Sequence, residues 1–239
     1  MNTRFSTHIV CSFALFLILG VTFAQAQTRR TPLAGRGAIV VDERLSVLRD
    51  SPSLYGKLLR RIGRGRVVTI LGRSQSRDGI VFYRVAVTRR TRGWMQREAL
   101  VLGNRRGDDL TLLRLIEASR EFDRIARARI FLDTFPYSRL RPVVLLIYAE
   151  AAEEAAVRLT RDASRRLSSE EIKAGGAPDF SYFLNYSGLD RYSRQGVKFV
   201  FDRAEKRFYY DGAAWREILR RYSQSDEALE ARKRLDAHR

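Results

Sequence analysis

The sequence predicts an α+β protein in which a small all-β barrel precedes a mainly α-helical region. Two patterns carry this prediction. Short apolar or alternating runs, separated by turn residues, fill residues 38–102 and are typical of strands. From residue 108 onward, the apolar residues recur at the spacing of amphipathic helices. The order of the two patterns places the all-β part first.

A change in charge supports a boundary between the two parts. Residues 36–106 hold 17 lysines and arginines against 5 acidic residues, whereas residues 107–239 hold 25 against 22. Residues 103–107, Gly-Asn-Arg-Arg-Gly, have the composition of a turn or linker. We therefore expect one domain at residues 38–102 and a second at residues 108–239.

The N-terminal segment has the pattern of a secretion signal. Arg4 supplies a positive charge, residues 9–23 are almost wholly apolar, and Ala24-Gln25-Ala26 is a small-x-small cleavage site. We expect residues 1–26 to be a signal peptide, cut after Ala26, of a secreted or periplasmic protein.

An uncleaved membrane anchor is the alternative, because residues 5–26 are uncharged and long enough to span a bilayer. Cleavage would leave residues 27–37 as a linker. It would also remove Cys11 and His8, so that the mature chain has no cysteine and only His238. This inventory excludes disulfides, Ser-His-Asp triads and histidine-held zinc or iron, and we expect no cofactor.

Five runs in the first domain have strand character. They lie at residues 39–41, 45–48, 67–71, 81–87 and 93–95. The segments between them include Asp50-Ser51-Pro52-Ser53, Gly63-Arg64-Gly65 and Arg77-Asp78-Gly79, which are turn sequences. Five or six short strands in a segment of this length make a small barrel or sandwich.

In order and spacing, these runs resemble the bacterial SH3 (SH3b) family. The matching segments are Leu45-Ser46-Val47-Leu48-Arg49, Pro52-Ser53, Gly63-Arg64-Gly65-Arg66-Val67-Val68, Phe82-Tyr83-Arg84-Val85 and Arg92-Gly93-Trp94-Met95. The chain departs from the family pattern at Leu48, at Asp50-Ser51 and at Phe82, where tryptophan often stands. The resemblance implies a binding module for peptidoglycan stem peptides or for an envelope protein.

The resemblance also implies candidate ligand-binding residues, because small SH3-like barrels bind in a groove lined by aromatic and loop residues. The candidates are Arg49, Tyr55, Arg73, Tyr83, Arg92 and Trp94. We expect Phe82 in the core, whereas Trp94 fits either the core or the groove.

The second domain begins with a predicted helical hairpin. Residues 108–134 have the apolar spacing of one amphipathic helix, which Pro136 ends. Ser138 is expected to cap a second helix, which tolerates Pro142 in its first turn and continues to about Leu167.

The end of the chain repeats this junction in part. Residues 130–138 line up with residues 217–225, and residues 226–235 continue as a short helix. The junction resembles that of tetratricopeptide (TPR) arrays, although Ser223 replaces the proline and no repeat of roughly 34 residues connects the copies. The resemblance implies a degenerate TPR-like region that docks a protein partner.

Residues 168–212 are less determined by the sequence. Residues 175–178, Gly-Gly-Ala-Pro, form a loop, whereas residues 197–201 and 207–210 are β-branched and aromatic. This composition favours an inserted β-hairpin before a helix that starts near Ala213. We expect most of the aromatic side chains here to lie in the core.

These observations predict a non-catalytic binding or adaptor protein of the cell envelope, whose basic domain binds peptidoglycan or an envelope protein. Nucleic acid is a poor partner for a secreted protein. Membrane contact is expected only if the signal segment is kept as an anchor.

Three alternatives stay open. The first is a cell-wall hydrolase that uses carboxylates of the helical region, where Asp108-Asp109, Glu153-Glu154 and Glu170-Glu171 are acidic pairs. Neighbours on a helix diverge by about 100° per residue, which suits solvation better than a shared site. The second is an all-β domain that packs on its own helical region and binds nothing. The third is a solvated basic surface without a dedicated ligand.

Overall fold

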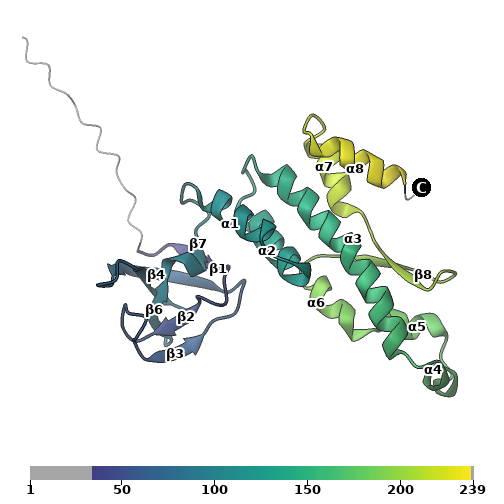
Figure 1. The fold of residues 1–239 in the computed structure, drawn as a ribbon, viewed down its shortest axis with the longest axis horizontal. Helices are drawn as coiled ribbons and strands as arrows, with labels where there is room; N and C mark the ends of the chain where they lie inside the picture. The colour runs from purple at the N-terminus through teal and green to yellow at the C-terminus, as the bar shows by residue number, and fades with distance from the viewer. Residues whose placement is uncertain (1–33, 238–239) are drawn as a thin grey trace, which may run out of the picture. The chain divides into compact units, whose positions relative to one another are not determined.

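The protein is of the mixed α+β type, as the sequence predicts (Figure 1). The computed structural model describes residues 34–237, which belong to one compact unit. The predicted signal peptide, its cleavage site and His238 lie outside the described residues. A seven-stranded antiparallel sheet comes first, and helices with a small second sheet follow it.

The large sheet contains two strands that the sequence pattern does not reveal. Its strands are β1 (Gly37–Val40), β2 (Val47–Arg49), β3 (Leu58–Arg61), β4 (Val67–Gln75), β5 (Val81–Ala86), β6 (Arg92–Gln96) and β7 (Leu100–Val101). Their order is β3-β2-β6-β5-β4-β1-β7, and no described pairing closes the sheet between β3 and β7. All four residues of β3 are exposed, so this strand has no alternation to detect, and β7 is only two residues long.

Alternation along the longer strands builds the core of this sheet. Val40, Ile70, Val85 and Met95 are fully buried, while their neighbours along each strand are more exposed. Phe82 is also fully buried, which confirms its predicted burial, although alternation along β5 places it on the opposite side of the strand from Tyr83 and Val85. The end of the predicted 27–37 linker is already ordered by the sheet, because backbone hydrogen bonds join residues 35 and 36 to β4.

The predicted helix over residues 108–134 is wrong in one respect, because the chain forms two helices, α1 (Asp108–Glu117) and α2 (Glu121–Thr134). The break lies at Ser119, which is buried and donates its hydroxyl to the carbonyl of Leu115. Arg124 of α2 donates to the carbonyl of Ser119, at 2.9 Å. The side chains of Ser119 and Arg124 thus donate to backbone carbonyl groups at the end of α1 that a continued helix would otherwise satisfy.

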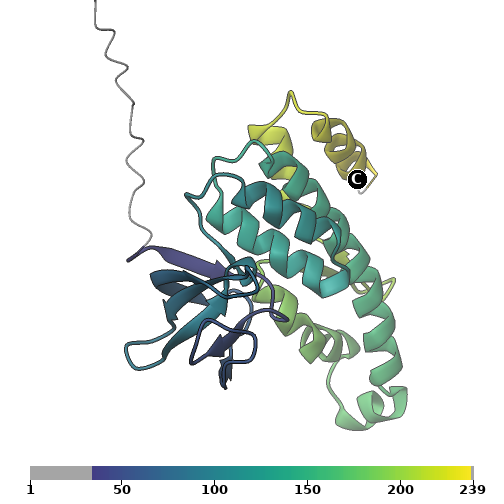
Figure 2. The same cartoon turned by 60° about the vertical axis from the view of Figure 1, so that its left-hand side comes forward.

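The predicted second helix is confirmed as α3 (Arg141–Arg166), with Pro142 in its first turn. The prediction that Ser138 caps this helix is wrong, because the N-cap is Leu140 and no side chain caps the first turn. The Ser138 hydroxyl instead accepts a hydrogen bond from the backbone N–H of Leu140 at 3.2 Å. Helix α2 packs along α3, and this pair makes the most extensive contact between helices (Figures 1 and 2).

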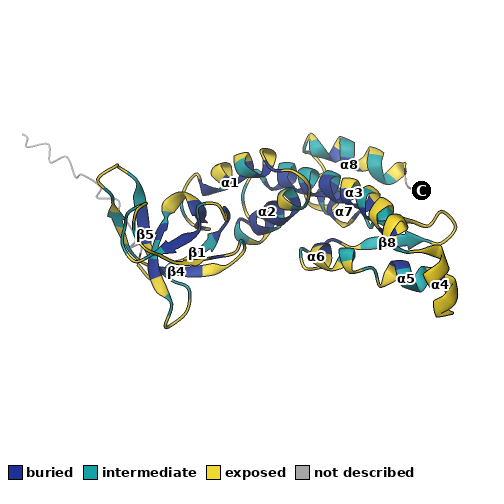
Figure 3. Cartoon of the chain, turned by 60° about the horizontal axis from the view of Figure 1, so that its bottom comes forward, coloured by how far each residue is buried: buried dark blue, intermediate teal, exposed yellow. Residues whose placement is uncertain are grey.

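Residues 168–212, which the sequence pattern determines least, form short helices followed by the predicted hairpin. The elements are α4 (Ser169–Gly175), α5 (Asp179–Leu184), a 3₁₀ turn (Ser187–Leu189), α6 (Asp190–Ser193), β8 (Phe199–Asp202) and β9 (Arg207–Tyr210). The pairing of β8 with β9 confirms the hairpin. Phe183, Tyr192 and Phe208 are buried as expected, whereas most of α4 is exposed (Figure 3).

The chain ends in α7 (Ala213–Arg221) and α8 (Glu227–Asp236), close to the predicted bounds. Helix α7 packs on both α3 and α8. Trp215 of α7 is 1% exposed and belongs to the core of the helical region. Within residues 34–237, no helix is both long enough and apolar enough to span a membrane.

The junction between sheet and helices is tightly bonded rather than a loose linker. Asp108 is buried, and its carboxylate accepts hydrogen bonds from the backbone N–H of Leu102 and from the guanidinium of Arg105. On the other side of the junction, Arg127 of α2 donates its Nε–H to the carbonyl of Val41, at 3.1 Å. Val41 also belongs to the helical core, so the two regions share buried contacts.

Candidate functional site

The six predicted ligand-binding residues do not form one groove. They occupy four places: the outer face of the sheet, its interior, an exposed position near the end of β4 and the loop between β2 and β3. Burial and strand register decide which of these side chains a ligand could reach.

Trp94 lies on the outer face of the sheet between two arginines. It is half-buried, and in the strand register it is opposite Arg49 of β2 on one side and Arg84 of β5 on the other. Directly opposed residues share one face of a sheet, with their Cβ atoms about 5 Å apart. Arg92 is two residues from Trp94 on β6 and therefore points to the same face. Trp94, Arg49, Arg84 and Arg92 are called the Trp94 face below.

Arg84 was not among the predicted residues, although a signal for it was present. It occupies the exposed position in the alternating run of β5, between buried Tyr83 and Val85. Its place beside Trp94 depends on the pairing of β5 with β6, which one strand's pattern cannot give.

Gly93 explains why a glycine precedes the tryptophan. A Cβ at this position would lie 2.6 Å from the carbonyl oxygen of Arg49 and 2.7 Å from the Leu48 side chain. Only glycine therefore allows β6 to approach β2 closely enough to set Trp94 beside Arg49. Arg49 is half-buried and donates to the carbonyl of Gly56 at 2.7 Å, so it also holds the β2–β3 loop.

The expectation that Tyr83 lines a groove must be corrected. Its side chain points into the sheet interior and is 4% exposed, because Tyr83 belongs to the inward-facing residues of β5. Its hydroxyl accepts a hydrogen bond from Arg105 at 3.0 Å, and Arg105 also binds Asp108. Tyr83 is therefore part of the junction between sheet and helices.

The remaining two candidates lie away from the Trp94 face. Arg73 of β4 pairs in register with Tyr83, so it belongs to the opposite side of the sheet, where it is exposed at the end of its strand. Tyr55 is at the tip of the β2–β3 loop and is 90% exposed. Neither side chain completes a pocket around Trp94.

The electrostatics of the Trp94 face are simple. Arg84 and Arg92 are exposed and make no ion pair with any described residue. Guanidinium groups without an acidic partner keep all their N–H donors available to water or to an anion, and they bind carboxylates and phosphates in a bidentate manner. The face can thus offer an aromatic contact and several strong donors to one anionic ligand.

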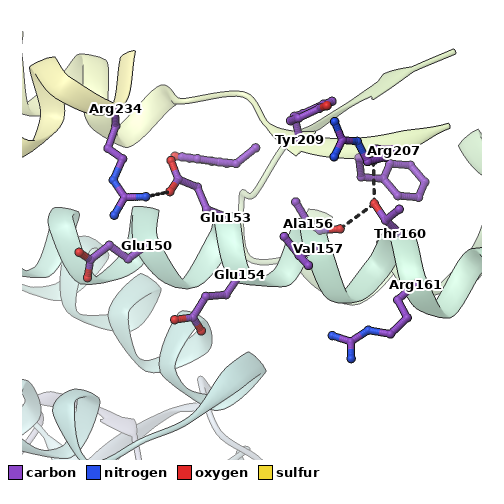
Figure 4. A pocket seen from close by; sticks show the side chains of 12 residues that line it. Glu150, Glu153, Glu154, Ala156, Val157, Thr160, Arg161, Arg207, Tyr209 and Arg234 are labelled. Carbon is purple, nitrogen blue, oxygen red and sulfur yellow. Dashed lines mark hydrogen bonds and ion pairs between the residues drawn. The ribbon is translucent and has the colours of Figure 1, made fainter. Parts of the chain in front are cut away.

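A second concave surface lies in the helical region (Figure 4). It is a groove of about 810 Å³ between α3, β9 and α8. Its walls carry three glutamates of α3, namely Glu150, Glu153 and Glu154, together with Arg207 and Arg234. The sequence pattern did not reveal this groove, because its walls come from three separate segments of the chain.

The glutamates of the groove have different roles. Glu153 accepts a hydrogen bond from Arg234 at 2.9 Å (Figure 4). It also accepts one from the indole of buried Trp215 at 2.8 Å, so it fastens α7 and α8 to α3. Glu154 is exposed and pairs with Arg158 at 3.5 Å. Burial raises the pKa of Glu150 above its ordinary value, and Arg234 opposes this shift.

The glutamates of this groove are poorly placed for hydrolysis by two carboxylates. Such a mechanism needs two carboxyl groups on opposite sides of the bond to be cleaved. Glu150 and Glu154 are one turn apart on the same helix and therefore lie on the same wall of the groove.

Scans against protein-family models, curated proteins and solved structures found no match to the chain. The function must therefore be argued from the residues of the molecule itself.

Proposed function

We propose that the protein is a non-catalytic binding or adaptor protein of the cell envelope, whose sheet binds peptidoglycan or an acidic envelope protein. The observation that carries this proposal is the Trp94 face. It places a half-buried tryptophan between arginines in cross-strand register, and Arg84 and Arg92 have no acidic partner among the described residues.

The chemistry of the ligand follows from that face. The free carboxylates of peptidoglycan stem peptides, or those of an acidic protein, would accept hydrogen bonds from the arginines. The indole would supply apolar contact area, which makes aromatic residues frequent anchors of binding surfaces. The predicted signal peptide supports a ligand in the envelope, because it sends the chain there.

The resemblance to the SH3b family supports the same proposal. Two of its motifs have a clear physical role, since Gly93 permits the close approach of β6 to β2 and Ser53 fixes the β2–β3 loop. By the same reasoning we assign the helical region a TPR-like role, the docking of a protein partner. Its exposed side chains Val157 and Leu229 support such a contact.

Co-sedimentation with purified cell-wall sacculi tests the proposal. Replacement of Trp94→Ala removes the aromatic anchor and should weaken binding by about 2 kcal/mol, roughly thirtyfold. Tyr137→Ala is the matched control, because Tyr137 is 96% exposed on the helical side and should leave binding unchanged. Absence of co-sedimentation at low salt, or equal loss in both variants, would contradict the proposal for the cell wall.

A cell-wall hydrolase remains the second candidate because of one observation, the raised pKa of Glu150 in the groove beside α3. A carboxyl that stays protonated at higher pH is a feature of catalytic acids. Release of soluble muropeptides that is abolished by Glu150→Gln would establish this activity. No release from sacculi that the protein binds would exclude it.

A further inference from the structure

The edge strand β3 has an unusual composition for a position open to solvent. It reads Leu58-Leu59-Arg60-Arg61, and all four residues are exposed. Leu58 is 48% exposed and Leu59 is 47% exposed. The strand lies at the opposite end of the sheet order from β7, which contacts the helices (Figure 1). Edge strands are usually protected by short length, charge, bulges or a covering segment, and β3 is short and carries two arginines. Its two exposed leucines still call for an explanation.

The apolar half of this edge continues into the preceding loop. Leu54 is 38% exposed and Tyr55 is 90% exposed. The loop is held in place, because Asp50 N–H donates to the carbonyl of Lys57 at 3.2 Å and Arg49 binds the carbonyl of Gly56. Four large apolar side chains within six residues are therefore displayed on a fixed scaffold.

The basic half of the edge continues into an arginine-lined hollow of about 480 Å³. Arg60, Arg61, Arg64 and Arg66 line it. Arg64 is neutralised by Glu43 and Asp123, at 3.3 and 2.9 Å. The other three arginines are exposed and make no ion pair with any described residue.

A second turn adds charge beside the hollow. Val87 and Thr88 line the hollow and begin the turn that carries exposed Arg89 and Arg90. The hydroxyl of Thr88 accepts hydrogen bonds from the backbone N–H groups of Arg90 and Thr91, which fixes the turn. Between residues 57 and 92 the chain has eleven basic residues and one acidic residue, Asp78.

We propose that this edge, defined as Leu54, Tyr55, Leu58, Leu59, Arg60 and Arg61, docks on the surface of an anionic phospholipid bilayer. The leucines and the tyrosine would enter the boundary between head groups and acyl chains, where aromatic and aliphatic side chains are stabilised. The arginines beside them would bind lipid phosphates. The contact needs no membrane-spanning segment. It adjoins the Trp94 face, because Leu58 pairs in register with Arg49, but it does not include Trp94.

Two features favour a membrane over a soluble polyanion. A soluble anionic chain would use the arginines but would leave the adjoining leucines in water. An acidic protein would need apolar groups of matching shape, whereas a fluid interface accepts any apolar outline. The contiguity of apolar and basic residues in one short strand is thus the observation that selects the bilayer.

Vesicle sedimentation tests this inference. The chain is used from residue 27 onward, so that the apolar leader cannot insert by itself, and this chain keeps the whole compact unit that begins at Leu33. Binding is expected to vesicles that contain phosphatidylglycerol but not to pure phosphatidylcholine, and it should weaken as salt rises.

Two double variants separate the charged from the apolar contribution. Arg60→Gln with Arg61→Gln should weaken binding by roughly twenty-five-fold, about fivefold for each arginine. Leu58→Ser with Leu59→Ser should weaken it by roughly tenfold, because less apolar area can leave water.

Matched controls come from the helical region. Arg165→Gln with Arg166→Gln removes two exposed arginines, and Val157→Ser with Leu229→Ser removes two exposed apolar side chains. Neither pair should change binding to anionic vesicles.

The membrane contact and the proposed function can fail separately. The Arg60 and Arg61 variant should still bind sacculi, and Trp94→Ala should still bind vesicles.

Several results would overturn the inference. They are no binding to anionic vesicles, equal binding to both lipids, and losses in the controls as large as those in the edge variants. Full competition by soluble glycerol phosphate would reassign the site to free phosphate, and equal binding to polyglutamate would reassign it to an acidic protein. If the leucine replacements left vesicle binding unchanged, the contact would rest on charge alone. That result would contradict the insertion of the leucines into the bilayer.

Discussion

Arginine has different surroundings in the two regions of this protein. Among the described residues, arginine forms ion pairs more often in the helical region than in the sheet, as in Arg129–Asp133, Arg141–Glu217 and Arg234–Glu153. In the sheet most arginines make no ion pair with a described residue, and this group includes Arg60, Arg61, Arg66, Arg73, Arg84, Arg89, Arg90 and Arg92.

The supply of acids explains this difference. Residues 36–106 have 5 acidic residues for 17 basic ones, whereas residues 107–239 have 22 for 25. A paired arginine joins elements of the fold, while clustered unpaired arginines repel one another and contribute nothing to folding. We therefore assign the paired arginines of the helical region to stability and the unpaired arginines of the sheet to binding.

The largest expected effect on stability is at Arg127, where the two regions meet. Its guanidinium is buried and donates to the carbonyl of Val41 and to the hydroxyl of Ser119. Arg127→Ala leaves both acceptors unsatisfied and opens a cavity, so we expect a loss of about 3 kcal/mol in the free energy of unfolding. Urea denaturation measures this loss.

Arg127→Met is the control for that measurement, because it keeps most of the side-chain volume but not the donors. Its loss should be clearly smaller than that of Arg127→Ala. A change below about 0.5 kcal/mol for Arg127→Ala would mean that the junction does not depend on this arginine.

The next largest effect is expected at Glu153 of α3. Glu153→Ala removes the acceptor of the buried Trp215 indole and of Arg234, which should cost about 2 kcal/mol in the free energy of unfolding. Glu153→Gln keeps an acceptor for the indole and should cost about half as much. Equal losses in the two variants would show that the charge, and not the hydrogen bond to Trp215, stabilises the contact.

A smaller effect on the free energy of unfolding, which depends on pH, is expected at Asp42 in the sheet region. Hydrogen bonds from Arg44 lower the pKa of Asp42 below its ordinary value of 3.8. A carboxyl whose pKa is lower in the folded state stabilises the fold above its unfolded pKa, and this contribution is lost as the pH falls through the folded pKa.

The comparison of the wild-type chain with Asp42→Asn tests the direction of this pH dependence. The difference in free energy of unfolding should be constant above about pH 5 and should shrink under more acidic conditions. A difference that grows on acidification would contradict the assigned direction.

The smallest effect on stability is expected for the unpaired arginines. Arg84→Gln and Arg92→Gln should each change the free energy of unfolding by less than about 0.5 kcal/mol, since neither side chain makes an ion pair with a described residue. A loss as large as that of Glu153→Ala would show that the sheet arginines stabilise the fold after all.

Much of the fold could be predicted from periodicity and turn residues. The main runs of the sheet, helix α3, the β8–β9 hairpin and the two final helices follow from local patterns. The break at Ser119 could not, because it depends on hydrogen bonds from Arg124 and Arg127 of the next helix. Strand β3 escaped prediction because an edge strand without a buried face shows no alternation.

The candidate site was predictable only in part. Trp94, Arg49 and Arg92 could be chosen from the sequence, but Arg84 required the register between strands, which fixes what lies beside Trp94. Tyr83 was misplaced because an aromatic residue in an alternating strand fits either face until its neighbours are known. The groove beside α3 depends on contacts between distant segments.

The central claim is that the unpaired arginines of the sheet, and not the exposed arginines of the helices, bind the ligand. The salt dependence of binding to sacculi tests this claim most directly. Two double variants are compared with the wild-type chain: Arg84→Gln with Arg92→Gln from the sheet, and Arg165→Gln with Arg166→Gln from the helices. We expect the sheet pair to weaken binding roughly tenfold or more at low salt and to flatten its dependence on salt, while the helical pair leaves both unchanged. Equal losses in both variants would contradict the account, because they would show that binding follows net charge rather than the Trp94 face.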